Sequence, residues 1–332
     1  MPELRKNPIT GRWVIIAAER EKRPRQFDRT REATGLEPCP FCAGSEAMTP
    51  PEVMAYRDSA SPPNSLGWSL RVVPNKYPAL IDSNASSFAP DLVFESRHAI
   101  GVHEVIIESP EHVVNMNALG VEQITRILRA YRERMLALRK DPRWRYILIY
   151  KNYGDRAGAT LEHVHSQLIA LPAVPEQVIV ELSGAQKYYD STGRCIYCEM
   201  IEQELRKRER LILDSAQFMA LCPFASRFSY ETWILPKHHM AAFEQSSEQD
   251  ISSLAHALRA IIAKLNHTLD NPPFNYLIHS IPPQESKHNY YHWHIEILPQ
   301  VARAAGFEWG TGMHINSVAP EDAARLLRET AL

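Results

Sequence analysis

The sequence EHVHSQ, from Glu162 to Gln167, places two histidines one residue apart and a glutamine two positions after the second. Residues i and i+2 of an extended segment point to the same face, so we expect His163, His165 and Gln167 to project toward one site. The stretch by itself leaves two interpretations open. Either both histidines bind one metal ion, or His163 binds the metal while His165 performs chemistry.

This stretch is part of a pattern that occurs twice in the chain. The first copy reads CPFC, HEVIIESPEH, YILIYKN and HVH in that order, and the second reads CIYC, YETWILPKHH, NYLIHS and HWH. His112 and His163 are 51 residues apart in the first copy, and His239 and His292 are 53 apart in the second. Matching motifs at matching spacing predict two similar structural units.

Each copy also contains one helical pattern between strand patterns. Apolar residues recur at steps of three and four over 121–138 and again over 251–265, which predicts two amphipathic helices. The runs EVIIES, YILIY, ETWILP and HIEILP are rich in β-branched or aromatic residues and predict strands. We therefore predict an α+β fold in which two units, each a mainly antiparallel sheet with packed helices, form one pseudo-twofold body. We place the two halves at 1–185 and 186–332, joined through 172–193, which carries Pro and Gly at its ends.

Each half contains one copy of a motif set with two cysteines and two histidines, which together suit a tetrahedral Zn²⁺. A lone CxxC pair is also typical of redox sites, but recurrence with the same partners favours zinc. For the second set, the alternative is a pair of ordinary buried thiols with His238 and His239 on the surface. We predict two zinc ions per chain. Their ligands are Cys39, Cys42, His112 and His163 in the first half, and Cys195, Cys198, His239 and His292 in the second.

A closed four-ligand zinc that includes His163 leaves His165 without a coordination role. Its ring nitrogen is then available as a nucleophile, and Gln167 can donate its amide NH₂ to an oxygen that gains negative charge. The alternative for His165 is a core histidine with satisfied hydrogen bonds. In the second half Glu296 stands where Gln167 stands in the first, and a carboxylate repels an anion. We therefore predict His165 and Gln167 as catalytic and His294 as structural.

Two further stretches contain groups that suit phosphate. The segment AEREKRPRQF holds four basic residues, among them Arg20 and Arg23, which either grip a diphosphate or form a solvated loop. The segment GDRAGATLEH, residues 154–163, is rich in small residues and can bring backbone N–H groups close to phosphate oxygens. It lacks the pattern GxxxxGK[ST], so a P-loop is not indicated.

The composition is that of an ordinary globular protein. Hydrophobic residues make up 45%, charged residues 23%, and the net charge is −2, so we expect no nucleic-acid partner. The apolar run Trp13–Ala18 is too short for a secretion signal or a membrane span, so we expect a cytoplasmic location and no membrane partner. In a reducing compartment CxxC pairs indicate metal or redox sites before disulfides, and the fifth cysteine, Cys222, is expected to be a buried thiol.

The chain resembles the galactose-1-phosphate uridylyltransferases, a duplicated branch of the histidine-triad superfamily. The resemblance rests on RKNPITGRWVIIAAEREKRP, CPFC, SPEH, the stretch from Asn152 to Gln167, and HVHSQ, and it covers nearly the whole sequence. It implies two histidine-triad-like halves and a double displacement through a nucleotidyl-histidine. In that reaction His165 attacks the α-phosphorus of a nucleotide sugar, releases the sugar 1-phosphate, and passes the nucleotide to a second phosphate acceptor.

The resemblance also implies roles for other residues. Gln167 would steady the transferred phosphoryl group, Arg20 and Arg23 would bind the diphosphate, and Asn75 would contact the base and ribose. The residues implied to line the phosphates are Asn152, Gly158, Ala159 and Thr160. A homodimer is implied as well, because the family commonly forms dimers.

Two departures from the family pattern bear on the substrate. Lys76 follows Asn75 where well-studied uridylyltransferases have an acid, and AGFEWGTG at 305–312 replaces a segment that carries a lysine for the hexose phosphate. This segment is similar to the branch that includes ADP-glucose phosphorylase, which also carries the second CxxC set, and we take Gly306, Phe307 and Gly310 as candidate substrate-binding residues. These residues do not distinguish uracil from adenine.

We therefore expect a UDP-glucose:hexose-1-phosphate uridylyltransferase that acts on a nucleotide sugar and a sugar 1-phosphate. The second candidate within the class is adenylyl transfer between ADP-glucose and phosphate. A nucleotide hydrolase of the same superfamily is the third candidate. An alternative from another class is a non-catalytic, zinc-stapled nucleotide-binding module. Loss of His165 or Gln167 would indicate the module, and both residues are present.

Overall fold

A computed structural model describes residues 2–6, 13–16, 38–58, 60–83, 93–285 and 289–332. Its centre is a ten-stranded sheet in which all neighbouring strands are antiparallel. In spatial order the strands are β3 (Met54–Arg57), β4 (Trp68–Pro74), β6 (Val102–Ile107), β8 (His165–Leu171), β7 (Tyr146–Tyr153), β12 (Phe274–His279), β13 (His294–Pro299), β11 (Thr232–Pro236), β10 (Phe218–Leu221) and β9 (Leu211–Asp214).

The order of strands reveals the two halves. Read inward from one edge the strands are β3, β4, β6, β8 and β7, and read inward from the other edge their equivalents are β9, β10, β11, β13 and β12. The halves meet where β7 pairs with β12. The HVH and HWH motifs lead into β8 and β13, which occupy matching positions on the two sides of this junction. The predicted α+β fold with mainly antiparallel strands and a pseudo-twofold arrangement is confirmed.

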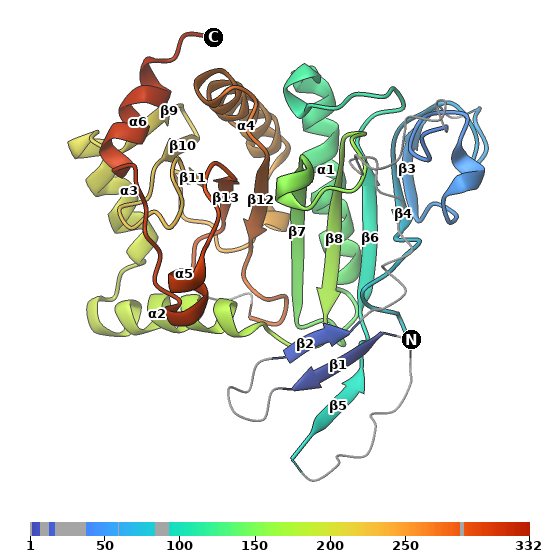
Figure 1. Cartoon of the computed structure of the whole chain (residues 1–332), viewed down its shortest axis with the longest axis horizontal. Helices are drawn as coiled ribbons and strands as arrows, with labels where there is room; N and C mark the ends of the chain where they lie inside the picture. Colours follow the sequence, from blue (N-terminus) through green and yellow to red (C-terminus); the bar gives the residue numbers. More distant parts are fainter. Residues whose placement is uncertain (1, 7–12, 17–37, 59, 84–92, 286–288) are drawn as a thin grey trace.

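The two long helices cover one face of this sheet (Figure 1). They are α1 (Val121–Leu138) and α4 (Glu248–Leu269), the amphipathic helices that the sequence predicts, and they pack against each other. Helix α4 begins at a capping box, in which the Ser247 hydroxyl and the Asp250 carboxylate accept each other's backbone N–H groups. One long helix from each half thus contributes to a single helical layer over the sheet.

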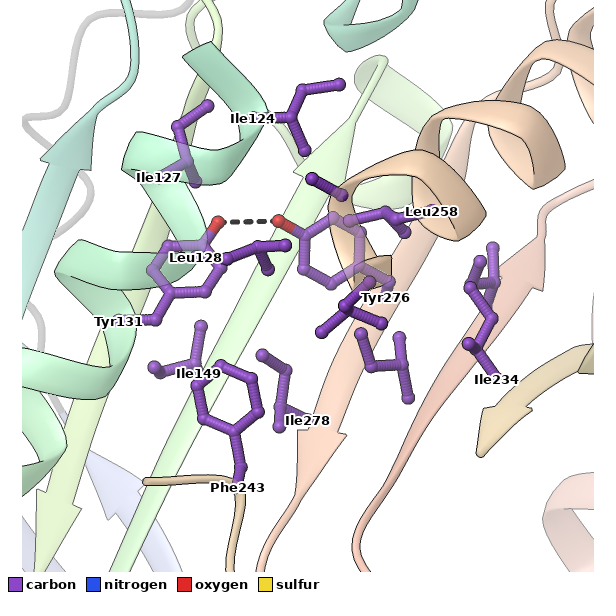
Figure 2. Close-up of a cluster of buried hydrophobic side chains, with 14 of the residues drawn as sticks. Ile124, Ile127, Leu128, Tyr131, Ile149, Ile234, Phe243, Leu258, Tyr276 and Ile278 are labelled. Atoms are coloured by element: carbon purple, nitrogen blue, oxygen red, sulfur yellow. Dashed lines mark hydrogen bonds between the residues drawn. The ribbon is translucent and has the colours of Figure 1, made fainter. Parts of the chain in front are cut away.

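The core between this layer and the sheet contains side chains of both halves. Figure 2 shows Tyr131 of α1 beside Tyr276 of β12 among buried aliphatic side chains. The two hydroxyls are hydrogen-bonded at 2.5 Å. Ile124 and Leu258, one from each long helix, are fully buried in the same cluster. Each such buried side chain contributes about 1.5–3 kcal/mol, so the two halves stabilise each other.

Shorter elements surround the main sheet. A second sheet of three antiparallel strands has the order β2 (Trp13–Ile16), β1 (Glu3–Lys6) and β5 (Glu95–His98). The remaining helices are α2 (Glu176–Thr192), α3 (Ile196–Lys207), α5 (Gly306–Thr311) and α6 (Pro320–Glu329), and the 3₁₀ turns are η2 (Glu46–Met48), η3 (Met116–Ala118), η4 (Asp155–Ala157) and η5 (Phe243–Gln245).

Helix α2 runs across the predicted division between residues 185 and 186, which stays a prediction. None of the helices in the described part of the chain combines the length and apolar composition that a bilayer crossing requires.

Successive side chains of β8 point alternately to the core face and to the site face of the sheet. Ser166, Leu168 and Ala170 are buried, and the last two belong to the core under α1. His165 and Gln167 therefore point to the opposite face of the sheet, as the i, i+2 spacing predicts.

Candidate active site

His165 is the first residue of β8 and is held in one tautomer. Its Nδ1 donates to the backbone carbonyl of His163 at 2.7 Å, which leaves the lone pair on Nε2. Its side chain is only 8% exposed, and burial, reinforced by the charge of Lys151, lowers the pKa of His165 to about 4. His165 is therefore neutral near pH 7. Within the described residues, no hydrogen-bond partner is found for Nε2.

Gln167 is held in one orientation by two donors. Its Oε1 accepts from the Tyr150 hydroxyl at 3.0 Å and lies 2.8 Å from Nε2 of His103. The Ala79 N–H donates to Nδ1 of His103, so Nε2 of His103 carries the proton and donates to Gln167. With its oxygen held in this way, the amide of Gln167 presents its NH₂ group as a donor.

The sequence did not single out His103 or Tyr150. Tyr150 of β7 pairs directly with Gln167 of β8, and His103 of β6 pairs with Ile169 of β8, one step along the same face. These positions follow from strand register. Asn75, the predicted base and ribose contact, lies beside this group, with its Nδ2 3.1 Å from Nε2 of His103.

The segment after β7 forms a tight turn. Gly154 and Gly158 adopt φ values of +81° and +85°, which favour glycine. The N–H groups of Gly158 and Ala159 donate to the carbonyls of Asp155 and Gly154, so both are used within the turn. Thr160, the last residue of the predicted phosphate-lining run 158–160, lies between this turn and His163.

The first cysteine and histidine set converges on one point. The four ligand atoms lie within 4.8 Å of one another. The distance from Sγ of Cys39 to Nδ1 of His163 is 3.6 Å, and Sγ of Cys42 is 3.4 Å from Nδ1 of His112 and 3.6 Å from that of His163. A tetrahedral zinc with Zn–S of about 2.3 Å and Zn–N of about 2.0–2.1 Å separates S and N by roughly 3.5 Å. The set therefore fits Zn²⁺.

The second set repeats this geometry. Sγ of Cys198 is 3.3 Å from Nδ1 of His239 and 3.6 Å from Nδ1 of His292, and Cys195 completes the group. Nε2 of His292 donates to the Pro236 carbonyl at 2.9 Å. In the first set, Nε2 of His163 likewise donates to the Ser109 carbonyl at 2.9 Å. Such bonds leave Nδ1 unprotonated and ready to bind a metal.

His294 occupies the position of His165 in the second half but has different surroundings. Its Nδ1 faces the His292 carbonyl at 3.2 Å, while Nε2 lies 3.7 Å from Oε1 of Glu181. Glu296, which replaces Gln167, is paired with Arg227 and lies 3.3 Å from Nε2 of His279. These carboxylates disfavour a phosphate at this place, and the structural role of His294 stays a prediction.

Glu181 and His279 were not predicted from the sequence. With His294 they form a third group of potential ligand atoms within 4.8 Å. Glu181 lies on α2 and also accepts from the hydroxyls of Tyr197 and Tyr291 at 2.8 Å each. Burial opposes the charge on His279, but the neighbouring carboxylates of Glu181 and Glu296 outweigh it and raise the pKa of His279 to about 9. His279 is therefore protonated and ion-paired.

Five predicted substrate-binding residues stay predictions. Arg20 and Arg23 lie outside the described residues. Gly306, Phe307 and Gly310 lie on α5, where Phe307 is 47% exposed, and they stay a prediction.

Comparison with known proteins places this chain in a family. Residues 1–175 match the model for the N-terminal domain of galactose-1-phosphate uridyl transferase, and residues 98–330 match a domain of unknown function, DUF4921. The chain is 38% identical to ADP-glucose phosphorylase of Arabidopsis thaliana, over 100% of this chain and 93% of that protein. It is 31% identical to galactose-1-phosphate uridylyltransferase of Thermotoga maritima, over 99% of both.

Solved structures agree with these likenesses. A crystal structure of the Arabidopsis thaliana ADP-glucose phosphorylase with bound ADP-glucose matches with a TM-score of 0.77 at 37% identity, over 100% of both chains. A uridylyltransferase structure matches with a TM-score of 0.82 at 28% identity, over 98% of this chain and 97% of the other. Fold, site and relatives together define an enzyme of the nucleotidyltransferase class. The chain belongs to the galactose-1-phosphate uridylyltransferase family, and its features include those of the ADP-glucose phosphorylase branch.

Proposed function

We propose that the protein transfers a nucleotidyl group between phosphate acceptors through His165. In the first step Nε2 forms a bond to the α-phosphorus of a nucleotide sugar, and the bond from that phosphorus to the sugar 1-phosphate breaks. In the second step an oxygen of the incoming phosphate attacks the same phosphorus and Nε2 leaves. The atoms balance in each step, and the enzyme returns to its initial state.

The observation that carries this proposal is the hydrogen bond from Nδ1 of His165 to the His163 carbonyl at 2.7 Å. It selects the tautomer whose Nε2 holds a lone pair, and it stabilises the positive charge that the ring gains when Nε2 is bonded to phosphorus. A neutral imidazole is the reactive form, and burial of His165 favours that form.

Gln167 supports the transfer from the same face. Its oxygen is occupied by Tyr150 and His103, so its NH₂ group is the part available to a non-bridging phosphoryl oxygen. An amide donor is neutral and suits an oxygen whose negative charge grows in the transition state.

We infer two zinc ions per chain, held by the two sets of cysteines and histidines named above. The ligand types and the sulfur–nitrogen distances of 3.3–3.6 Å support this inference. When bound, the zinc would cross-link segments that are distant in the sequence and would take no part in the transfer. His163 itself presents the carbonyl that fixes the tautomer of His165.

Uridylyl transfer from UDP-glucose to a hexose 1-phosphate is the first candidate reaction. The family match over residues 1–175 and the Thermotoga maritima relative support it. Adenylyl transfer between ADP-glucose and phosphate is the second candidate. It is supported by the higher identity of 38% to the Arabidopsis thaliana protein named ADP-glucose phosphorylase. Both reactions use the same chemistry at His165 and differ in the base and in the acceptor.

We also propose a homodimer in the cytoplasm, with the chain divided into halves at 1–185 and 186–332. The family resemblance supports the dimer. The five cysteines all lie within the described residues and none of them forms a disulfide, which suits a reducing compartment.

A labelling experiment tests the reaction and the base together. The protein is incubated with UDP-glucose or ADP-glucose labelled at the α-phosphate, then analysed for an acid-labile, base-stable adduct. We expect an adduct with one of the two, its loss in His165→Ala, and its retention in the control His238→Ala, which alters an exposed histidine. No adduct with either sugar nucleotide, or one that persists in His165→Ala, contradicts the mechanism. Release of free nucleotide without an acceptor would indicate a hydrolase.

A further inference from the structure

Asn275 of the second half contacts the predicted phosphate-binding segment of the first half. It lies on β12 directly opposite Asn152 on β7, at the junction of the two halves. Its Nδ2 donates to Oδ1 of Asn152 and to the carbonyl of Ala157, both at 2.8 Å. Its Oδ1 accepts from Nε2 of Gln300 at 2.9 Å. Both N–H groups and the oxygen of Asn275 therefore have partners, and its orientation is unambiguous.

This orientation determines that of Asn152. Because Oδ1 of Asn152 faces the NH₂ of Asn275, its own NH₂ points away from β12 and toward the turn. A Cβ atom placed on Gly158 would lie 3.7 Å from Nδ2 of Asn152. The reversed amide would set two NH₂ groups against each other and lose a hydrogen bond worth about 0.5–1.5 kcal/mol. Asn152 thus presents a donor beside Gly158.

The second half also supports the turn itself. The Ala157 carbonyl, in the middle of the turn, is held by Asn275. A Cβ atom on Gly154 would come within 3.0 Å of Cβ of Pro273, so the turn and the segment before β12 are in close contact. The Gln300 N–H in turn donates to the Pro273 carbonyl at 2.7 Å.

These bonds are not needed to hold the halves together. The β7–β12 ladder and the shared core do so, and Tyr131 and Tyr276 join the halves on the opposite face of the sheet. A second amide pair on that face, Nδ2 of Asn266 with Oδ1 of Asn115 at 3.2 Å, also connects them. What distinguishes Asn275 is that its partners lie where the phosphates of the nucleotide are expected.

We propose that Asn275 is a positioning residue for the diphosphate of the nucleotide sugar. It directs the NH₂ of Asn152 toward the phosphates and holds the turn at 154–158 in place. This inference rests on the proposed function. It gives the second half, whose own HxH motif faces carboxylates, a part in substrate binding in the first half.

Asn275→Asp is the sharpest test, because it keeps the size of the side chain but removes both donors. The carboxylate would attract the NH₂ of Asn152, which turns that donor away from the phosphates. Binding is measured by titration in a His165→Ala background, in which no turnover occurs. The ligands are the nucleotide sugar and the corresponding nucleoside, either UDP-glucose with uridine or ADP-glucose with adenosine.

We expect Asn275→Asp to weaken binding of the nucleotide sugar about tenfold and to leave binding of the nucleoside unchanged, since only the former carries phosphates. Asn275→Ala, which removes the donors without adding charge, should weaken it in the same direction. Asn266→Asp is the matched control, because it breaks an amide pair between the halves away from the site, and it should change neither affinity.

Three results would overturn the inference. If both Asn275 variants bind the nucleotide sugar with unchanged affinity and the enzyme with native His165 still forms its adduct, the role of Asn275 is overturned and the proposed function stands. Equal losses for nucleotide sugar and nucleoside would show a general disturbance rather than phosphate positioning. Absence of binding of either nucleotide sugar to the His165→Ala protein, without an adduct in the native chain, would overturn the inference together with the proposed function.

Discussion

Nζ of Lys151 donates to the backbone carbonyl of His165 at 2.8 Å, from the face of the sheet opposite to the His165 imidazole. Lys151 is 1% exposed and is paired with the fully buried Glu108 at 2.5 Å. Burial lowers the pKa of Lys151, and the carboxylate of Glu108 opposes that effect. The Tyr131 hydroxyl links Glu108 to Ser166, the next residue of β8. A buried polar group thus fixes the strand that carries the proposed nucleophile.

Removing this support should slow catalysis more than it weakens binding. Lys151→Met alone would leave the Glu108 charge buried and unpaired, at a cost of about 3–5 kcal/mol. The double variant Lys151→Met with Glu108→Gln removes both charges, and we expect it to fold. Its kcat should fall about tenfold, corresponding to about 1.4 kcal/mol, with KM nearly unchanged. Steady-state kinetics with thermal melting measures both, and an unaltered kcat in the folded double variant would contradict the role of Lys151.

Gln167→Glu should remove the phosphoryl donor while keeping the local packing. The carboxylate can still accept from Tyr150 and His103, but it presents no NH₂ group to a developing negative charge. We expect adduct formation to slow by about 10²–10³-fold, as for loss of one oxyanion donor. Rapid-quench measurement of the labelled adduct tests this.

Glu296→Gln is the matched control for Gln167→Glu, because it makes the reverse change at the equivalent position of the second half. It should leave the rate of adduct formation near that of the native chain and should not create a second labelled histidine. A label on His294 in this variant would show that the surroundings of the second HxH motif do not prevent chemistry there.

The two metal sets should differ in their effect on function. Cys39→Ser and Cys195→Ser should each reduce the zinc content by one ion per chain, measured by elemental analysis of the purified protein. Loss of the first ion should nearly abolish adduct formation, because its ligand His163 supplies the carbonyl that orients His165. Loss of the second should mainly lower the melting temperature, since the proposed reaction assigns His294 no part in the transfer. A native zinc content below two per chain would contradict the second site.

The charge on His279 should make stability depend on pH in a defined window. Its pKa of about 9 in the folded chain is above the ordinary value of 6.5, so the protonated form stabilises the fold. That contribution is complete below pH 6.5 and disappears as the pH rises through 9, and it amounts to something on the order of 3 kcal/mol. Urea unfolding of the native chain and of His279→Gln should show a stability difference that shrinks between pH 6.5 and 9.5. A difference that is constant over this window would contradict the ion pairs of His279.

Much of the site could be predicted because its signals are local or repeated. The CxxC pairs, the HxH motifs and their similar spacing are visible in the sequence, and strand alternation places His165 and Gln167 on one face. Tyr150, His103 and Lys151 carry no such signal. Tyr150 and Lys151 are adjacent residues of one strand, yet one contacts Gln167 from the site face and the other contacts His165 from the core face. Which faces which depends on the register between β7 and β8.

The sequence by itself determined the duplicated α+β plan, and it pointed to two candidate metal-binding sets and to a candidate nucleophile, because periodicity and motif spacing express short-range geometry. The tertiary structure alone decided how the halves cooperate. Asn275 follows Asn152 by 123 residues, and Glu181 lies on a helix without any metal or catalytic motif. Their contacts arise from the pairing of β7 with β12 and from the packing of α2. Such pairings depend on the free energy of the whole core, which no local pattern encodes.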